Sequence, residues 1–161
     1  AGNDTTKTTT TFTTHALQQF PEQRALLAQD FDGRIGVAIE EFVRWTTPVM
    51  TFRRTATQDT ELHGQQIRAG DWVTMVYSSA NRDERVFDNP MGFDITRSPN
   101  HHVAFGGGGP HYCMGAFMAK MQLEAIFREL IFRAPDLRVG EPEYLTGNFI
   151  TAIKKLPYTL D

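Results

Sequence analysis

The chain contains a single cysteine, Cys113, among its 161 residues. One cysteine cannot form an internal disulfide, so we expect a protein of a reducing compartment, the cytoplasm. An excess of charge is also lacking, because the net charge is only −3, and nothing suggests a partner nucleic acid. No apolar run approaches the length of a transmembrane segment, and no secretory signal opens the sequence. These absences favour an ordinary globular domain, long enough to bury a sizeable core.

The hydrophobic pattern predicts helices in the first third of the chain, short strands in the middle and one further helix near the end. Residues 1–20 favour a helix despite many threonines, and Pro21 opens a second helix to about Phe31. The dipeptide Asp32-Gly33 is expected to break that helix. The other expected elements are a helix over 34–46, short strands over 49–75, a long ordered loop over 83–104, a helix after Cys113 that ends near residue 134, and short strands with turns to the end. We therefore expect a mainly α protein with small β-sheets (α+β).

The most informative segment is a glycine-rich loop directly before the cysteine, Phe-Gly-Gly-Gly-Gly-Pro-His-Tyr-Cys-Met-Gly over residues 105–115. A thiolate there faces the N-terminal amides of the following helix, which lower a cysteine's pKa. The glycines let the backbone approach a flat ligand closely, and Phe105 is placed to shield the sulfur from water. A haem iron held by a cysteine thiolate needs these features. Apolar positions on one side of the following helix are Phe117, Met118, Met121 and Ala125.

The loop matches the sequence patterns of several common binding sites less well. A dinucleotide fingerprint requires its third glycine elsewhere, and a phosphate-binding loop requires a Gly-Lys-Ser/Thr ending. One cysteine cannot anchor the common zinc sites. Two alternatives stay open at this point: a hydrolase with Cys113 as nucleophile and a distant histidine as base, and a small buried cysteine without chemistry.

The loop resembles the haem-binding loop of the cytochromes P450, although one extra residue separates Phe105 from Cys113. Four further segments match that family in the family's order. The first, Ala-Gly-Asn-Asp-Thr over residues 1–5, resembles the oxygen-activating part of its long central helix. The resemblance implies that Asp4 and Thr5 are catalytic and relay protons to iron-bound dioxygen. Taken alone, these residue types are more typical of a helix N-cap.

Glu41 and Arg44 resemble the family's Glu-x-x-Arg pair. At this spacing the two side chains share a helix face, so an ordinary surface ion pair is the alternative. The resemblance implies that both lock onto Arg97, in the long loop before the cysteine, and hold the haem-side core together. Their implied role is structural.

The resemblance implies haem b as cofactor, with the thiolate of Cys113 as axial ligand. Arg54 and His111 match positions that bind the haem propionates, and guanidinium suits carboxylate. A solvated strand arginine and a loop histidine are the alternatives for these two. His102 is expected to be an ordinary structural histidine. The other implied cofactor-binding residues are Phe105, Gly106, Gly107 and Gly115.

These matches span nearly the whole chain. We therefore expect the C-terminal part of the cytochrome P450 fold, from the oxygen-activating helix through the haem-binding loop to the C-terminus. Residues 1–161 would form a partial P450 domain, and the first residues, unlike an initiator sequence, also indicate a fragment. The four-glycine loop and residues 77–84 and 148–154 resemble actinobacterial P450s that oxidise methyl-branched lipids and sterol side chains. Terminal-alkane or fatty-acid hydroxylases are the nearest alternative.

The resemblance implies a monooxygenase that inserts one oxygen atom from dioxygen into a hydrophobic substrate, by terminal hydroxylation of a branched lipid or sterol side chain. Electrons would come from an external donor such as ferredoxin with its reductase, because the sequence contains no flavin or nicotinamide motif. A non-catalytic haem-binding protein or an inactive fragment is the alternative from a different class. Apolar substrate candidates, which core packing explains equally well, are Val49, Met50, Phe52, Phe149 and Ile150.

Overall fold

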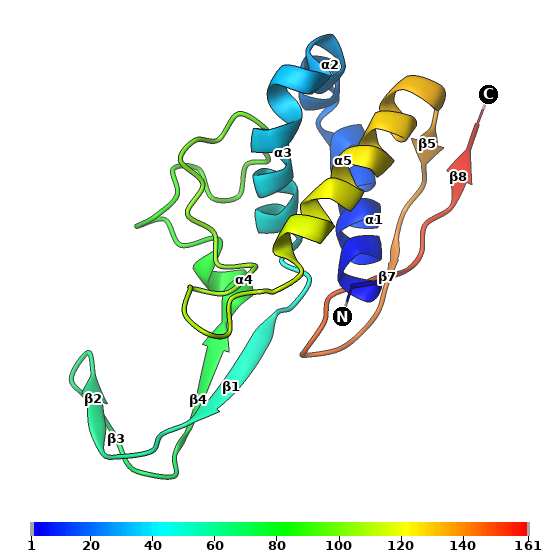
Figure 1. The fold of residues 1–161 in the computed structure, drawn as a ribbon. Helices are drawn as coiled ribbons and strands as arrows, with labels where there is room; N and C mark the ends of the chain where they lie inside the picture. The colour runs from blue at the N-terminus through cyan, green and yellow to red at the C-terminus, as the bar shows by residue number, and fades with distance from the viewer. Residues whose placement is uncertain (1, 161) are drawn as a thin grey trace.

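The computed structural model describes residues 2–160, which form helices and two-stranded antiparallel sheets (Figure 1). The helices are α1 (Asp4–Gln19), α2 (Pro21–Gln29), α3 (Phe31–Thr46), α4 (Tyr77–Ala80) and α5 (Ala116–Arg133). The paired strands are β1 (Thr51–Thr55) with β4 (Trp72–Val76), β2 (Thr60–Leu62) with β3 (Gln65–Ile67), β5 (Arg138–Val139) with β8 (Tyr158–Thr159), and β6 (Glu143–Tyr144) with β7 (Ile153–Lys155). The predicted class, mainly α with small β-sheets, is confirmed, and α4 is an additional short helix.

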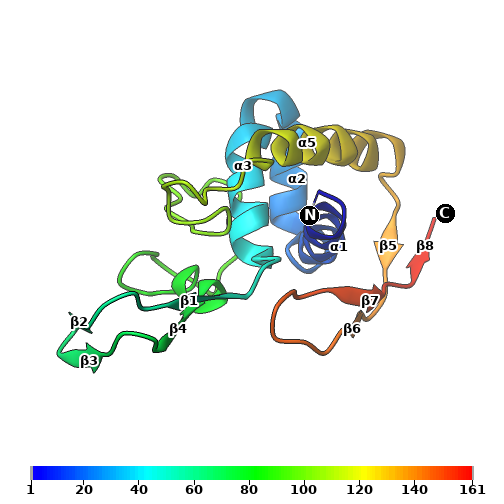
Figure 2. The same ribbon diagram turned by 60° about the horizontal axis from the view of Figure 1, so that its bottom comes forward.

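The core lies where α1, α3 and α5 pack against one another (Figure 2). Phe42 of α3 is completely buried, and its ring lies 4.8 Å from the ring of Phe127 on α5. Leu17 brings α1 into the same cluster. Truncating a buried phenylalanine to alanine typically costs about 3–5 kcal/mol, so these helices form the stable frame on which the loops sit.

The boundary between α2 and α3 differs from the prediction. The break falls at Asp30, and Asp32 and Gly33 lie in the first turn of α3. The Asp30 side chain accepts the backbone N–H of Gly33 at 3.1 Å and so caps the new helix. A Cβ at Gly33 would lie 2.5 Å from the Asp30 carboxylate, so glycine here leaves room for the cap and does not break the helix.

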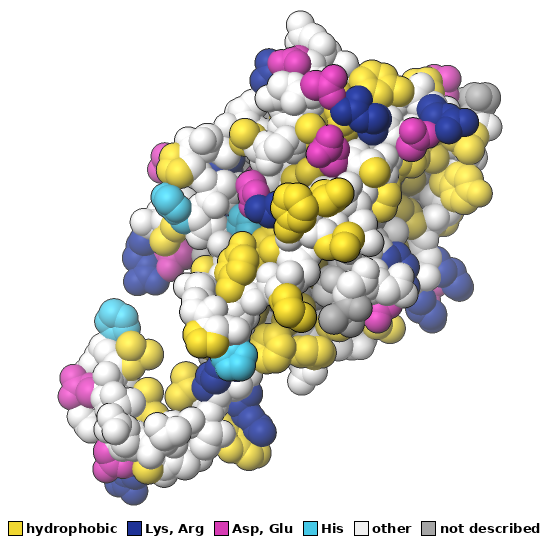
Figure 3. All heavy atoms as spheres, in the orientation of Figure 1, with side chains coloured by type: hydrophobic (Ala, Val, Ile, Leu, Met, Phe, Trp, Pro, Cys, Tyr) yellow, Lys and Arg dark blue, Asp and Glu magenta, His cyan; other side chains and the backbone are white. Residues whose placement is uncertain are grey.

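α5 packs through a different face from the apolar one noted in the sequence. Its buried residues include Leu123, Phe127 and Ile131. The side chains of Phe117 and Met118 are 77% and 61% exposed. Figure 3 shows hydrophobic side chains gathered on the molecular surface where Figure 1 places the start of α5. The helix thus carries two apolar faces, and only one is covered within the described residues.

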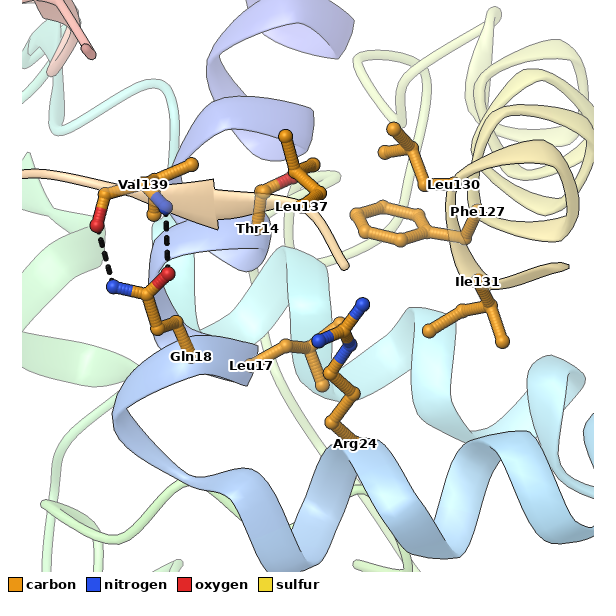
Figure 4. Close-up of a pocket in the computed structure, with 9 residues that line it drawn as sticks. All are labelled: Thr14, Leu17, Gln18, Arg24, Phe127, Leu130, Ile131, Leu137 and Val139. Carbon is orange, nitrogen blue, oxygen red and sulfur yellow. Dashed lines mark hydrogen bonds between the residues drawn. The ribbon is translucent and has the colours of Figure 1, made fainter. Parts of the chain in front are cut away.

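The remaining segments extend from this helical frame. β1 and β4 project away from it, with β2 and β3 at the tip (Figure 1). Residues 81–115 contain neither helix nor strand, which confirms the long loop predicted over 83–104. The C-terminal strands return to α1, where the N–H of Val139 donates to the Gln18 side chain at 2.6 Å (Figure 4). Beside this contact lies a cavity of about 30 Å³ that no predicted site residue lines. No helix within residues 2–160 is long and apolar enough to cross a membrane.

Candidate functional site

The glycine loop closes on itself just before α5. The N–H of Cys113 donates to the carbonyl of Phe105 at 2.8 Å. Gly106, Gly108 and Gly109 have φ of +96°, +100° and +74°, which side chains rarely tolerate, whereas Gly107 does not need this freedom. The loop therefore has no side chains at residues 106–109, before the cysteine, so a flat ligand can approach its backbone closely.

The sulfur of Cys113 is a free thiol on the surface of the chain. The Phe105 ring packs against the core cluster and lies 5.8 Å from the His102 ring, and its shielding of the sulfur stays a prediction. Among residues 2–160, no neighbours bury Cys113, as the alternative of a small buried cysteine would require. Gly115 is the N-cap of α5, and a Cβ there would lie 3.9 Å from the sulfur. The thiol is thus open to a ligand.

Two predicted anion-binding side chains are exposed. Arg54 lies on β1, where its guanidinium carbon is 5.8 Å from the centre of the Phe52 ring and one of its N–H groups donates to the Arg53 carbonyl at 3.0 Å. His111 lies in the loop, two residues before Cys113. Neither side chain forms an ion pair with a carboxylate within residues 2–160. Both therefore have donors to offer an anionic ligand.

Asp4 and Thr5 lie in the first turn of α1, and Ala1 lies outside the described residues. Asn3 occupies the N-cap position without a side-chain hydrogen bond, so the simple capping alternative does not describe it. Asp4 is exposed, whereas Thr5 is half-buried. The neighbouring Thr6 hydroxyl donates to the Gln122 side chain of α5 at 3.3 Å. This contact joins the start of α1 to the helix that follows Cys113.

The five predicted substrate contacts form one cluster, although they come from two segments that are far apart in the sequence. Val49 and Ile150 form an antiparallel bridge, and the N–H of Met50 donates to the Phe149 carbonyl at 2.8 Å. The rings of Phe52 and Phe149 meet edge-to-face at 5.4 Å. These two rings are 41% and 48% exposed, so core packing alone does not explain them. The cluster offers an apolar surface next to Arg54.

Glu41, Arg44 and Arg97 meet in a buried ion-pair cluster. Glu41 accepts two hydrogen bonds from Arg44, both at 2.7 Å, and a third from Arg97 at 3.2 Å. Glu41 and Arg44 are completely buried, which contradicts the surface-pair alternative. Arg44 also donates to backbone carbonyls of Pro90 and Gly92 in the long loop. The cluster thereby fastens that loop to α3.

Sequence reasoning missed Asn81, which is completely buried at the end of α4. Its side-chain oxygen accepts the N–H of Val103 at 2.8 Å, and its amide donates to the Thr47 hydroxyl at 2.8 Å. Its carbonyl accepts from Arg44. Asn81 therefore holds the segment that enters the glycine loop. The only signal was a short polar stretch, Ser-Ser-Ala-Asn-Arg-Asp, that matched the family.

The chemistry of these donors fits haem. An exposed thiol suits the iron, and a loop without side chains suits the close approach of a flat macrocycle. Arg54 and His111 offer donors that suit carboxylate groups. The described residues thus provide a suitable group for the iron, for the flat macrocycle and for the carboxylates of haem.

Comparison with known proteins places the chain in one family. The sequence model of the family "Cytochrome P450" matches residues 35–134. The chain is 48% identical to a methyl-branched lipid omega-hydroxylase of Mycobacterium tuberculosis, over 99% of this chain and 37% of that protein. It is 46% identical to a steroid C26-monooxygenase of Mycolicibacterium smegmatis, over 96% of this chain and 36% of that protein.

A solved structure agrees with these relatives. A cytochrome P450 of Mycobacterium marinum in complex with pseudoionone superposes with a TM-score of 0.96 at 56% identity, covering 98% of this chain and 38% of that one. The chain thus spans less than two fifths of the length of each of these three proteins. These matches rule out the hydrolase alternative. The chain belongs to the cytochrome P450 family.

Proposed function

We propose that this chain supplies the haem-binding and oxygen-activating part of a monooxygenase that inserts one oxygen atom from dioxygen into a hydrophobic substrate. One observation carries the proposal: an exposed thiol, Cys113, follows a loop of left-handed glycines and precedes α5. Proteins of this family hold haem on a cysteine thiolate. Residues 1–161 would form part of one P450 domain.

The residues around the thiol would divide the binding of haem b among them. The sulfur of Cys113 would bind the iron, and Arg54 and His111 would hold the propionates by charge-assisted hydrogen bonds. Phe105, Gly106, Gly107 and Gly115 would line the ligand side of the ring. Haem with a thiolate ligand supplies the chemistry that cleaves the O–O bond and oxidises an unactivated C–H bond.

Asp4 and Thr5 would deliver the protons that this chemistry consumes. The Thr5 hydroxyl is half-buried, so it can hold a proton away from bulk water, whereas the exposed Asp4 carboxylate can exchange protons with solvent. Together, the two side chains would form a two-step relay from solvent inward. Electrons would come from an external donor such as ferredoxin with its reductase, in the cytoplasm, where a lone cysteine stays reduced.

The apolar cluster of Phe52 and Phe149 would orient the substrate. Exposed aromatic rings next to the Arg54 side chain suit an aliphatic chain, and relatives named methyl-branched lipid omega-hydroxylase and steroid C26-monooxygenase support a branched lipid or sterol side chain. Terminal hydroxylation requires a fixed geometry, because internal C–H bonds are easier to oxidise. A terminal-alkane or fatty-acid hydroxylase is the second candidate.

The experiment that tests this function is reduction under carbon monoxide of the protein expressed from its complete gene. The thiolate-ligated haem should give a long-wavelength Soret band, and Cys113→Ala should abolish it. A protein that retains the band after Cys113→Ala would overturn the assignment of the ligand. Haem binding without any reductase-dependent oxidation would favour a non-catalytic haem protein.

Binding titrations then decide the substrate. We expect branched fatty acids or cholest-4-en-3-one to bind more tightly than linear alkanes, and Phe149→Ala to weaken them. Phe132→Ala, which removes another exposed ring at the far end of α5, is the matched control. Products hydroxylated only at internal carbons would argue against terminal hydroxylation.

A further inference from the structure

The His102 ring is hydrogen-bonded through both of its nitrogens, in the segment that enters the glycine loop. Nδ1 accepts the N–H of Ala104 at 3.2 Å, and Nε2 lies 2.9 Å from a carboxylate oxygen of Glu40. A nitrogen that accepts carries no hydrogen, so Nε2 carries it and donates to Glu40. The side chain is 4% exposed. The His102 side chain therefore links its own loop to α3 from a buried position, whereas its partner Glu40 is half-buried, with a side chain that is 30% exposed.

Glu40 connects this histidine to the helix that follows Cys113. Its other carboxylate oxygen pairs with the ammonium group of Lys120 on α5. The hydrogen bond from His102 lowers the pKa of the Glu40 carboxyl, and Lys120 adds to this effect while burial opposes it. Glu40 is thus ionised at neutral pH and joins a histidine and a lysine from two separate segments.

Two of these three side chains, His102 and Lys120, lie next to the Phe105 ring. The Lys120 nitrogen lies 5.4 Å from the centre of the Phe105 ring, a distance at which a cation is attracted to an aromatic face. The centre of the His102 ring lies 5.8 Å from the centre of the same ring. The carbonyl of Phe105 accepts the N–H of Cys113 at 2.8 Å. A continuous series of contacts thus runs from α3 to the cysteine backbone.

We propose that Glu40, His102 and Lys120 form a positioning triad that orients Phe105 and, through its carbonyl, the backbone of Cys113. The proposal rests on the proposed function, because Cys113 is the proposed iron ligand. The triad shares no side chain with the Glu41 cluster, which fastens the loop through contacts at Pro90, Gly92 and Asn100. Its members are positioning residues and not catalytic residues.

Amide hydrogen exchange in the protein expressed from its complete gene tests the triad. Glu40→Gln and Lys120→Met should each speed exchange of the Cys113 amide about tenfold, because each removes a hydrogen bond to a charged group. The double variant should show no larger effect than either single change, since both break the same link. Lys120→Arg keeps the cation and should stay within about twofold of the unchanged protein.

The control is Glu143→Gln. Like Glu40, Glu143 pairs with two basic side chains, which here are Lys154 and Lys155, but it lies on β6. This substitution should leave the exchange rate of the Cys113 amide unchanged. Unaltered exchange in Glu40→Gln and Lys120→Met would overturn the proposal. So would equal loss of protection at the Phe42 amide of α3, since the cluster would then maintain the whole fold.

Carbon monoxide spectra separate this proposal from the proposed function. If the unchanged protein lacks the long-wavelength Soret band, the haem-thiolate function fails, and the exchange rates still decide the positioning of the loop. If the band is present, the triad variants should lose it faster than Glu143→Gln during incubation. Equal rates of loss would contradict a positioning role.

Discussion

At the scale of single residues, the buried charge of Glu41 is matched by partners for both of its carboxylate oxygens. Glu41 accepts from Arg44, from Arg97, from the Asp94 N–H at 2.9 Å and from the Asn100 amide at 3.0 Å. Removing a carboxylate from such a cluster leaves cations without compensation, and that cost exceeds the strength of any single hydrogen bond. Exposed pairs such as Glu129 with Arg133 contribute little by comparison.

Glu41→Gln should therefore lower the free energy of unfolding by about 3–5 kcal/mol. The glutamine keeps the size of the side chain but leaves the buried Arg44 without its counter-charge. Urea unfolding followed by circular dichroism measures the change. Glu129→Gln, which breaks an exposed pair, should change stability by no more than about 0.5 kcal/mol. Equal effects of the two substitutions would contradict a structural role for the cluster.

Thr5→Ala should uncouple turnover, because the proposed relay loses the hydroxyl that delivers protons. Electrons would then leave as hydrogen peroxide, and less product would form for each reductant consumed. Parallel assays of product, peroxide and reductant measure this ratio. Thr10→Ala is the control, since the Thr10 hydroxyl donates to a carbonyl within α1 in the same way as many others. Full activity with hydrogen peroxide alone and no effect of Thr5→Ala would favour a peroxygenase.

At the scale of elements, the local spacing of apolar residues predicts which helices form. Long-range contacts determine where a helix begins and which of its faces is buried. The spacing of Ile35, Ile39 and Phe42 predicts α3, but the cap at Asp30 starts it three residues earlier than expected. In α5, both the exposed and the buried apolar residues have helical spacing, so only packing against α1 and α3 selects the buried face.

The same limit applies to the candidate site. The glycine loop with Cys113 and the pair of Glu41 and Arg44 are local patterns, so the sequence reveals them. The side chains of Asn81 and His102 form hydrogen bonds with residues 22 and 62 positions away, and no local sequence pattern predicts such partners.

Asp30→Ala tests the boundary of α3. The substitution removes the side-chain acceptor for the Gly33 N–H and should lower the free energy of unfolding by about 1 kcal/mol. Asp30→Asn keeps an acceptor and should retain most of the stability. Denaturant unfolding gives both values. A loss as large for Asn as for Ala would mean that the carboxylate charge, and not the cap, matters at this position.

At the scale of the whole molecule, the candidate site lies on open surfaces around a well-packed helical frame. Cys113, Phe52 and Phe149 are exposed, and so is the outer face of α5. The buried core therefore supports the residues of the site. The surface that would face haem and substrate is apolar and accessible within the described residues (Figure 3). Such a contiguous apolar surface favours association in water.

We therefore expect residues 1–161, expressed alone, to self-associate through the outer face of α5. Phe117, Met118 and Met121 lie within one helical turn of one another and are 77%, 61% and 53% exposed. Met118→Lys combined with Met121→Glu should shift the sedimentation profile towards monomer without loss of helix, because neither side chain contributes to the buried core. Leu62→Ser, which removes an exposed apolar side chain at the end of β2, should leave association unchanged. A purely monomeric unchanged chain at high concentration would show that this face does not drive association.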